Sequence, residues 1–321
     1  MGSKGSIMER IILGVSSCLI GEKVRFNGGH KRDNYLCDFL ANYVDFLPIC
    51  PEVAIGLGVP RPAIRLVGDP KNPHLVNSNN SQADYTLKML DFAQSAMKQL
   101  KGISGYILKS QSPTCGLKRV KIYQSKGQAP KLGQGLYARL LVEQFPYLPI
   151  EEEGRLNDPT LRENFIERIF IYHDWQTSIK AGLTANSLVD FHSRHKLTLM
   201  AHHPIKSREL GRLVSQVDKR DLSELAAQYL PIFMGILSLI ATPKKHANVL
   251  QHCLGYFKKV ISKQDKQELV TLIENYRLGL VPLIVPLTLL NHHLSHYPQP
   301  YLEKQSYLLP YPAELMLRNH I

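Results

Sequence analysis

Three of the five cysteines in this sequence lie in local settings that suit a metal site. Cys18 follows a short apolar segment and precedes a glycine-bearing loop, Cys50 is followed by Pro-Glu, and Cys115 lies in a tight Ser-Pro-Thr-Cys-Gly segment. Thiolates are natural ligands of soft metals and of iron–sulfur clusters. A cubane cluster usually takes four cysteines, so three would leave one iron open to a substrate atom. The pattern alone also fits three small, buried and inert residues.

The other two cysteines favour packing roles, because Cys37 and Cys253 lie inside predicted helices beside leucines. An odd, sparse set of cysteines in a chain of 321 residues is not typical of a disulfide scaffold. We therefore expect a protein of the reducing cytoplasm. The first ten residues lack the apolar core of a signal peptide, and no apolar run reaches the roughly 18 residues that span a bilayer, so no membrane partner is expected.

Each of the three cysteines follows a predicted strand. Short apolar runs predict strands over residues 11–15, 44–49 and 104–108, and helical periodicity predicts helices over 35–44, 84–100 and 132–143. Strands alternating with helices predict an α/β domain with a mostly parallel sheet. In such sheets the loops after the strands gather at one edge, where ligands bind. The three thiols should therefore meet, although 31 and 64 residues separate them.

A boundary is expected where a segment with three prolines and an acidic run ends the first half. Beyond it the sequence predicts helices over 159–181, 187–201, 205–217, 222–240, 244–261 and 263–278. We therefore predict an α/β domain over residues 7–147, a linker over 148–159 and an all-α domain over 160–321.

The charge of the chain indicates a polyanionic partner. The formal net charge is +12, and residues 1–150 hold 19 Lys and Arg against 10 Asp and Glu, so the first domain is the more basic one. Such a balance favours either nucleic acid or an anionic membrane surface, and it also fits a basic protein with no special partner. No Gly-x-x-x-x-Gly-Lys-[Ser/Thr] phosphate loop is present, so no nucleotide cofactor is expected. The oligomeric state does not follow from the sequence.

Four motifs in the first half resemble a known family. The segments, in order, are VSSCLIGEKVRFNG, ICPEVAIGLGVPRP, LKSQSPTCG and KLGQGLYARLL. Together they resemble the thiouracil desulfidase family over about residues 10–145. The resemblance implies a compact Rossmann-like α/β domain that binds a [4Fe–4S] cluster through Cys18, Cys50 and Cys115. It also implies that the iron without a protein ligand takes the sulfur of the substrate.

The second half resembles a helical family that is found fused to the first, over about residues 160–320. The segments that carry this resemblance include LVDFHSRHKLTLMAHHP, RELGRLV and NVLQHCLGYFKK. Proteins with this fusion are similar to tRNA 4-thiouridine desulfidases, in which the helical domain is the RNA-binding part. The resemblance implies that tRNA is the partner and that 4-thiouridine is converted to uridine with release of sulfide.

Such a reaction needs a base that activates water and groups that hold the substrate. Glu52, two residues after Cys50, is the first candidate for the base, although a carboxylate there could also cap the next segment. Ser112 could orient water or transfer a proton, or simply form the turn before Pro113, and Lys109 could stabilise developing charge. Ser16, Arg25 and Asn27 are candidates for substrate binding, and the last two could instead structure their loop.

Two sets of residues are candidates for RNA contact. A basic run follows Cys115, and a polar, aromatic and basic stripe with helical spacing lies in the second domain. The run contains Lys118, Arg119, Lys121, Lys126 and Lys131, and the stripe contains Asn248, His252, Tyr256 and Lys259. Both sets could also be ordinary solvated surface. His192, His195, His202 and His203 invite a metal interpretation, but no carboxylate or thiol completes a clear ligand set, which favours structural or RNA-facing histidines.

Two other functions stay open. The same chemistry could act on free thiobases or thionucleosides, although a small substrate needs neither the helical domain nor the basic charge. The chain could also be a non-catalytic RNA-binding protein with a structural zinc ion or iron–sulfur cluster. A closed site of that kind needs a fourth ligand, and the sequence shows no obvious fourth cysteine.

Overall fold

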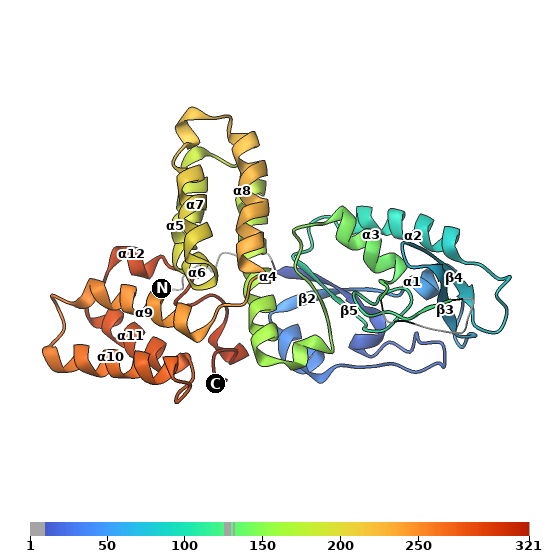
Figure 1. Ribbon diagram of the computed structural model, residues 1–321, viewed down its shortest axis with the longest axis horizontal. Coiled ribbons are helices and arrows are strands. Elements are labelled where there is room, and N and C mark those ends of the chain that lie inside the picture. The colour runs from blue at the N-terminus through green and yellow to red at the C-terminus, as the bar shows by residue number, and fades with distance from the viewer. Residues whose placement is uncertain (1–9, 125–129, 131, 321) are drawn as a thin grey trace, which may run out of the picture. The chain divides into compact units, whose positions relative to one another are not determined.

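The computed structural model describes residues 10–124, 130 and 132–320 (Figure 1). The chain divides into two compact units, Met1–Asn157 and Asp158–Ile321. The first unit has helices and a mostly parallel sheet and the second is all-helical, which confirms the predicted fold class. No helix among the described residues is both long enough and apolar enough to cross a membrane.

A four-stranded parallel sheet forms the centre of the first unit. Its strands, in spatial order, are β2 (Val44–Ile49), β1 (Ile11–Ser16), β5 (Gly105–Leu108) and β7 (Ile150–Glu152). Ile11, Leu13 and Val15 of β1 are buried, whereas Ile12 is exposed. Gly14 of β1 has no side chain because Tyr106 of β5 lies over it, and a Cβ atom there would stand 2.2 Å from the ring. The sequence of β1 therefore fits a strand in the middle of a sheet.

Helices α2 (Thr86–Gln99) and α3 (Leu136–Gln144) lie side by side in the first unit (Figure 1). The buried residues of α2 are Met89, Ala93, Ala96 and Met97, and their spacing of three or four gives the helix one apolar face. Helix α1 (Pro51–Ala54) is a single turn that begins directly after Cys50. Its proline is at the first helical position, where the missing N–H costs nothing.

A second, three-stranded sheet was not predicted from the sequence. Strand β3 (Ile64–Asp69) pairs antiparallel with β4 (Asn72–Asn77) and parallel with the two-residue strand β6 (Ile122–Tyr123). The strands are short and carry polar residues at several positions, so their apolar pattern is weak.

Two predictions for the first unit were wrong in detail. The helix predicted over residues 35–44 is a π-helical turn, η2 (Tyr35–Phe39), followed by a 3-10 turn, η3 (Leu40–Asn42). Leu36 and Leu40 are nevertheless buried one turn apart, which is the pattern that predicted the helix. The segment 148–159 is not an open linker, because it contains β7 and the 3-10 turn η4 (Arg155–Asn157).

Nine α-helices form the described part of the second unit. They are α4 (Pro159–Lys180), α5 (Ala185–Arg194), α6 (Lys196–His202), α7 (Pro204–Val214), α8 (Leu222–Leu237), α9 (Pro243–Phe257), α10 (Lys263–Arg277), α11 (Ile284–His296) and α12 (Pro300–Glu303). Local signals start many of them. Asp158, Asp221 and Ser262 accept hydrogen bonds from the first-turn amides of α4, α8 and α10, and Thr184 forms a capping box at α5.

The helical unit has two apolar clusters. One joins α4, α5, α7 and α8 around Trp175, Phe191, Tyr229 and Phe233, and the other joins α6, α9, α10 and α11. The helix predicted over 187–201 is divided into α5 and α6 at His195, whose ring is fixed by Asp174 at 2.8 Å and Ser306 at 2.7 Å. Helix α11 was not predicted.

His192, which is buried, and His246, which is half-buried, predict that the helical unit loses stability in mild acid. Burial lowers the pKa of His192 to about 4 and the pKa of His246 to about 3. In an unfolded chain these groups take up protons near pH 6.5. Unfolding therefore binds protons between pH 6.5 and about 4, and the free energy of unfolding falls as the pH is lowered through that window, by on the order of 2–5 kcal/mol.

Trp175, the single tryptophan of the chain, measures this effect directly. It is buried and stacked on Tyr229, so its fluorescence reports the unfolding of the helical unit. The urea midpoint should be lower at pH 5 than at pH 7, and a variant with His192→Gln and His246→Gln should show a flatter dependence. An equal fall in the variant would contradict this origin.

Candidate functional site

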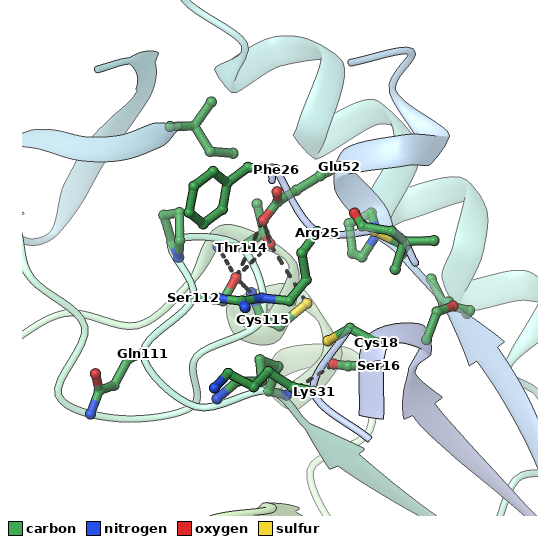
Figure 2. A pocket seen from close by; sticks show the side chains of 18 of the residues that line it. Ser16, Cys18, Arg25, Phe26, Lys31, Glu52, Gln111, Ser112, Thr114 and Cys115 are labelled. Carbon is green, nitrogen blue, oxygen red and sulfur yellow. Dashed lines mark hydrogen bonds between the residues drawn. The ribbon is translucent and has the colours of Figure 1, made fainter. Parts of the chain in front are cut away.

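The three candidate thiols line one pocket at the carboxyl edge of the parallel sheet (Figure 2). Cys18 follows β1, Cys50 follows β2 and Cys115 lies in the loop after β5. These strands are direct neighbours in the order β2, β1, β5, and all run in the same direction, so their ends coincide. The cavity has a volume of about 390 Å³. The expectation that the three cysteines meet in space is confirmed.

Cys18 and Cys50 are held by the turns that end their strands. Cys18 is buried in the 3-10 turn η1 (Ser17–Ile20), which ends at Gly21 with a φ of 97°. The carbonyl of Cys18 accepts a hydrogen bond from the Lys31 amide at 2.8 Å, which fastens the following loop to the turn. Cys50 is half-buried and immediately precedes α1.

Cys115 is buried in a loop that folds back on itself. The Ser112 hydroxyl accepts hydrogen bonds from the amides of Thr114 at 3.2 Å and Cys115 at 3.1 Å. The start of α3 closes the loop from the other side, because the amide of Ala138 donates to the carbonyl of Thr114 at 3.1 Å. At Gly135 a Cβ atom would stand 2.3 Å from that carbonyl oxygen, so the close approach requires glycine.

Burial keeps the thiols protonated. Burial, and then the neighbouring thiol of Cys50, raise the pKa of Cys18 to about 11, and burial raises the pKa of Cys115 to about 12. Hydrogen bonds from Thr114 and Ser16 act in the opposite direction on Cys115. Burial also raises the pKa of Cys50. A soft metal that bound here would displace these protons, as metal binding to thiols generally does.

The three thiols have the donor chemistry of an iron–sulfur cluster site. In the described part of the chain, no group of three or more His, Cys, Asp or Glu side chains is arranged to hold one metal ion. Three thiols instead surround a cavity, and all five cysteines are free of disulfides. Thiols distributed around a space suit a polynuclear iron–sulfur group. Cys18, Cys50 and Cys115 would hold it.

Glu52 lies beside the thiols as one member of a buried ion pair. Its Oε2 atom accepts hydrogen bonds from the Arg61 guanidinium at 2.5 and 3.1 Å. Only 3% of the Arg61 side chain and 16% of the Glu52 side chain are exposed. Removing either partner would leave the other charge poorly solvated, which is costly at a buried site. The pair therefore fixes the direction of the Glu52 carboxylate.

The second oxygen of Glu52 begins a chain of hydroxyl groups. The Thr114 hydroxyl donates to Glu52 Oε1 at 3.0 Å and lies 2.9 Å from the Ser112 hydroxyl (Figure 2). Thr114 Oγ1 is also 3.6 Å from the sulfur of Cys115. The arrangement connects a carboxylate, two hydroxyls and a thiol, so it can accept, pass and return a proton.

Lys109 lies in the pocket, but its ammonium group is already engaged. It forms a short ion pair with Glu153 and donates to the hydroxyl of Ser110 at 2.9 Å. The backbone amide of Lys109 donates to the Ser16 hydroxyl at 2.9 Å. Lys109 thus joins the loop after β5 to the ends of β1 and β7.

Most of the predicted site residues come together. Those that line the pocket are Cys18, Cys50, Cys115, Ser16, Arg25, Glu52, Lys109 and Ser112. Asn27 does not line it, because its side-chain oxygen accepts a hydrogen bond from the Gly29 amide at 3.2 Å and shapes the turn. This is the structural alternative that the sequence left open.

Arg61, Thr114 and Phe26 also line the pocket and were not predicted from the sequence. Thr114 could have been found, because its hydroxyl is adjacent to Cys115 in the chain, whereas the contact between Arg61 and Glu52 depends on the tertiary structure. Phe26 lines the pocket with 43% of its surface exposed, and the guanidinium carbon of Arg25 lies 5.6 Å from the ring centroid. An aromatic ring that lines a pocket and remains partly open can stack on a flat ligand.

The residues predicted to contact RNA lie on the surface where they are described. Lys118, Arg119 and Lys121 are exposed after the Cys115 loop, whereas Lys126 and Lys131 lie outside the described residues. Asn248, His252 and Tyr256 are exposed on α9, and Lys259 is exposed in the turn that follows this helix. The ring of Tyr256 also stacks on Tyr301 at a centroid distance of 5.3 Å.

The four histidines have structural roles. His192 pairs with the Tyr229 hydroxyl at 3.3 Å, and His195 bridges Asp174 and Ser306. His202 pairs with Glu167 at 2.8 Å. His203 accepts a hydrogen bond from an amide in the first turn of α7.

Comparison with known proteins assigns each half to a different family. Residues 13–153 match the family described as 2-thiouracil desulfurase, and residues 196–312 match the family described as Protein of unknown function (DUF1722). Uncharacterized protein YbgA of Escherichia coli (strain K12) is 36% identical over 166 residues, which cover 51% of this chain and 95% of that protein.

Two further proteins are similar to parts of the chain. Uncharacterized protein YbbK of Bacillus subtilis (strain 168) is 32% identical over 151 residues, which cover 45% of this chain and 97% of that protein. A solved structure named [4Fe-4S]-dependent thiouracil desulfidase TudS is 31% identical and matches 47% of this chain and 95% of that chain, with a TM-score of 0.37. Each relative thus matches about half of this chain.

Proposed function

Because the chain belongs to the 2-thiouracil desulfurase family through residues 13–153 and to the DUF1722 family through residues 196–312, we propose that it removes sulfur from 4-thiouridine in tRNA. The reaction exchanges the C4=S group of the pyrimidine for C4=O and releases sulfide. The observation that carries the proposal is the pocket in which three thiols face a carboxylate and two hydroxyls.

The donor set supports a [4Fe–4S] cluster on Cys18, Cys50 and Cys115. Once bound, a cluster with one iron free of protein ligands would supply a thiophilic Lewis acid for the sulfur of the substrate. Glu52, Thr114 and Ser112 are the protein groups that would then handle protons at C4.

Glu52 is the general base of the proposed mechanism. Its Oε1 atom faces the pocket hydroxyls while Arg61 occupies Oε2, so Oε1 is the oxygen that takes a proton from water. The water oxygen forms a bond to C4 as the C4–S bond breaks. Overall, one thiocarbonyl group and one water molecule give one carbonyl group and one molecule of hydrogen sulfide. The reaction involves no net transfer of electrons.

Thr114 and Ser112 carry the proton from the base toward the leaving sulfur. Their oxygens are 2.9 Å apart, and Thr114 reaches both Glu52 and the Cys115 sulfur. The Ser112 hydroxyl accepts two backbone amides, and its own hydrogen can be donated to the Thr114 hydroxyl at 2.9 Å or to Glu52 Oε1 at 3.5 Å. Lys109 contributes a positive charge at the pocket wall, held in place by Glu153.

Phe26 and Arg25 form the wall on which the pyrimidine ring would stack. Figure 2 shows Phe26 and the Cys115 and Cys18 sulfurs on opposite sides of Ser112 and Thr114. The carbonyl of Phe26 accepts a hydrogen bond from the Arg61 amide at 2.8 Å, so the wall is tied to the same arginine that orients Glu52. A base inside tRNA would have to leave its stack to reach this wall.

The positive charge supports RNA rather than a free base as substrate. The net charge is +12, and exposed cations follow the Cys115 loop directly. Lys and Arg side chains hold the phosphates on either side of a target nucleotide. The exposed face of α9 offers polar, aromatic and basic groups of the kind that contact RNA. Five cysteines free of disulfides suit the cytoplasm, where tRNA is found.

The first prediction of the proposed function concerns the substrate and the thiols together. Anaerobically reconstituted protein should convert 4-thiouridine in bulk tRNA to uridine, as quantified by nucleoside mass spectrometry. Cys115→Ser should lose both bound iron and activity. Cys37→Ser is the matched control, since Cys37 is a half-buried thiol that does not line the pocket, and it should keep both.

Each other outcome has a defined meaning. Turnover of free 4-thiouridine or thiouracil without turnover of tRNA would replace the proposal with desulfuration of small thiopyrimidines. Bound iron without turnover of either substrate would favour a non-catalytic RNA-binding protein.

The second prediction concerns Glu52. Glu52→Gln keeps the size of the side chain and removes the base, so kcat should fall about 10²–10⁴-fold with little change in KM. Iron content should be unchanged. Glu143→Gln is the control, because Glu143 is an exposed glutamate of α3 that does not line the pocket. If Glu52→Gln has the same kcat as wild type, Glu52 is not the general base.

A further inference from the structure

Strand β7 ends the parallel sheet with two glutamates, and a third follows directly. They are Glu151, Glu152 and Glu153, which belong to the segment that the sequence predicted as a linker. Glu151 and Glu152 are 8% and 7% exposed, and the side chain of Glu153 is 14% exposed. Carboxylates are rarely buried to this degree unless they are paired. Their partners therefore indicate what they do.

Glu153 binds the start of the loop that carries Cys115. Its Oε2 atom accepts the Ser110 amide at 2.7 Å, and its Oε1 atom accepts the Ser110 hydroxyl at 2.9 Å and pairs with the Lys109 ammonium. Both oxygens are used, and both hold residues that directly follow β5. The amide of Glu153 in turn donates to the carbonyl of Leu108 at 3.2 Å.

Glu152 binds the end of the same loop. Its Oε1 atom accepts the amides of Leu117 at 2.8 Å and Lys118 at 3.3 Å. These residues come just after Cys115. Two consecutive carboxylates thus hold the two ends of one loop, and residues 111–116 lie between the fixed ends.

The loop needs such support, because its course is not regular secondary structure. Gln111 has a φ of 60°, which is uncommon for a residue with a side chain. A backbone amide that is removed from water loses its hydrogen bond to the solvent and needs a protein acceptor instead. A charged acceptor stabilises such an amide more than a neutral one does. Glu152 and Glu153 supply charged acceptors at three amides.

Glu151 differs from its two neighbours. Its Oε1 atom accepts hydrogen bonds from the Arg155 guanidinium at 2.8 Å and from the Glu152 amide at 3.0 Å, and both of these partners lie on its own segment. It is as buried as Glu152 and adjacent to it in the chain. Glu151 is therefore a matched control for the two glutamates that reach the loop.

We propose that Glu152 and Glu153 are positioning residues that hold the 109–118 loop in place, so that Cys115 and Ser112 are presented to the pocket before any cofactor arrives. A site whose groups are already oriented loses less conformational entropy when it binds or reacts. The consequence for cluster retention rests on the proposed function, whereas the claim about the loop itself does not.

The experiment compares four variants with wild type. Glu152→Met and Glu153→Met keep the approximate volume and remove the acceptors, and Glu151→Met is the control. Glu152→Gln is a rescue variant, because the amide keeps one acceptor oxygen and Glu152 uses only Oε1. Far-UV circular dichroism establishes that each variant is folded.

Hydrogen exchange of the metal-free protein tests the loop. In peptides that cover residues 108–119, Glu152→Met and Glu153→Met should exchange about tenfold faster or more than wild type, as expected for the loss of hydrogen bonds to a charged group. Glu151→Met and Glu152→Gln should stay within about threefold of wild type. Equal exchange in all four variants and wild type would overturn the proposal.

The rate at which iron is released to a chelator tests whether the held loop helps the protein to retain its cluster. After reconstitution, Glu152→Met and Glu153→Met should lose iron several-fold faster than wild type and Glu151→Met. If Glu152→Met and Glu153→Met retain iron as well as wild type does, the two glutamates have no effect on cluster retention, and the proposed function is unaffected. If wild type takes up no cluster, the proposed function fails, and the exchange data still decide the role of the two glutamates.

Discussion

The parallel pairing of β1 with β2 on one side and β5 on the other is the constraint on which the site depends. Each thiol follows the end of one of these strands, so the direction of the sheet decides that the three meet. Close packing within the sheet maintains this arrangement, as the contact between Gly14 and Tyr106 shows. A strand in the opposite direction would carry its cysteine to the far edge.

A buried ion pair makes the two oxygens of the Glu52 carboxylate different from each other. The Arg61 guanidinium holds one oxygen of Glu52, and the other oxygen meets the hydroxyls of Thr114 and Ser112. On another wall, Lys109 and Glu153 form a second pair that binds loop to strand. The first pair joins residues 52 and 61 on one segment of the chain, whereas the second joins residues 109 and 153, which are 44 positions apart.

The three strands that precede the thiols could be predicted from the sequence, because apolar runs before Cys18, Cys50 and Cys115 identify β1, β2 and β5 directly. Glu52 and Ser112 could be chosen from their distance along the chain to a cysteine. Arg61, Phe26 and the glutamates of β7 could not, since their contacts depend on tertiary structure. The run 151–153 illustrates the difficulty. Three consecutive acidic residues resemble a solvated linker, and the donors that pair with Glu152 and Glu153 come from the 109–118 loop, which is distant in the sequence.

The central claim is that Cys18, Cys50 and Cys115 hold a four-iron cluster in which one iron faces the substrate. Mössbauer spectroscopy of protein reconstituted with ⁵⁷Fe, with and without a 4-thiopyrimidine, tests it most directly. The account predicts that one iron in four differs from the others and that its signal alone changes when the thiopyrimidine is added. Four equivalent sites that ignore the ligand, or a signal from isolated iron ions, would contradict it.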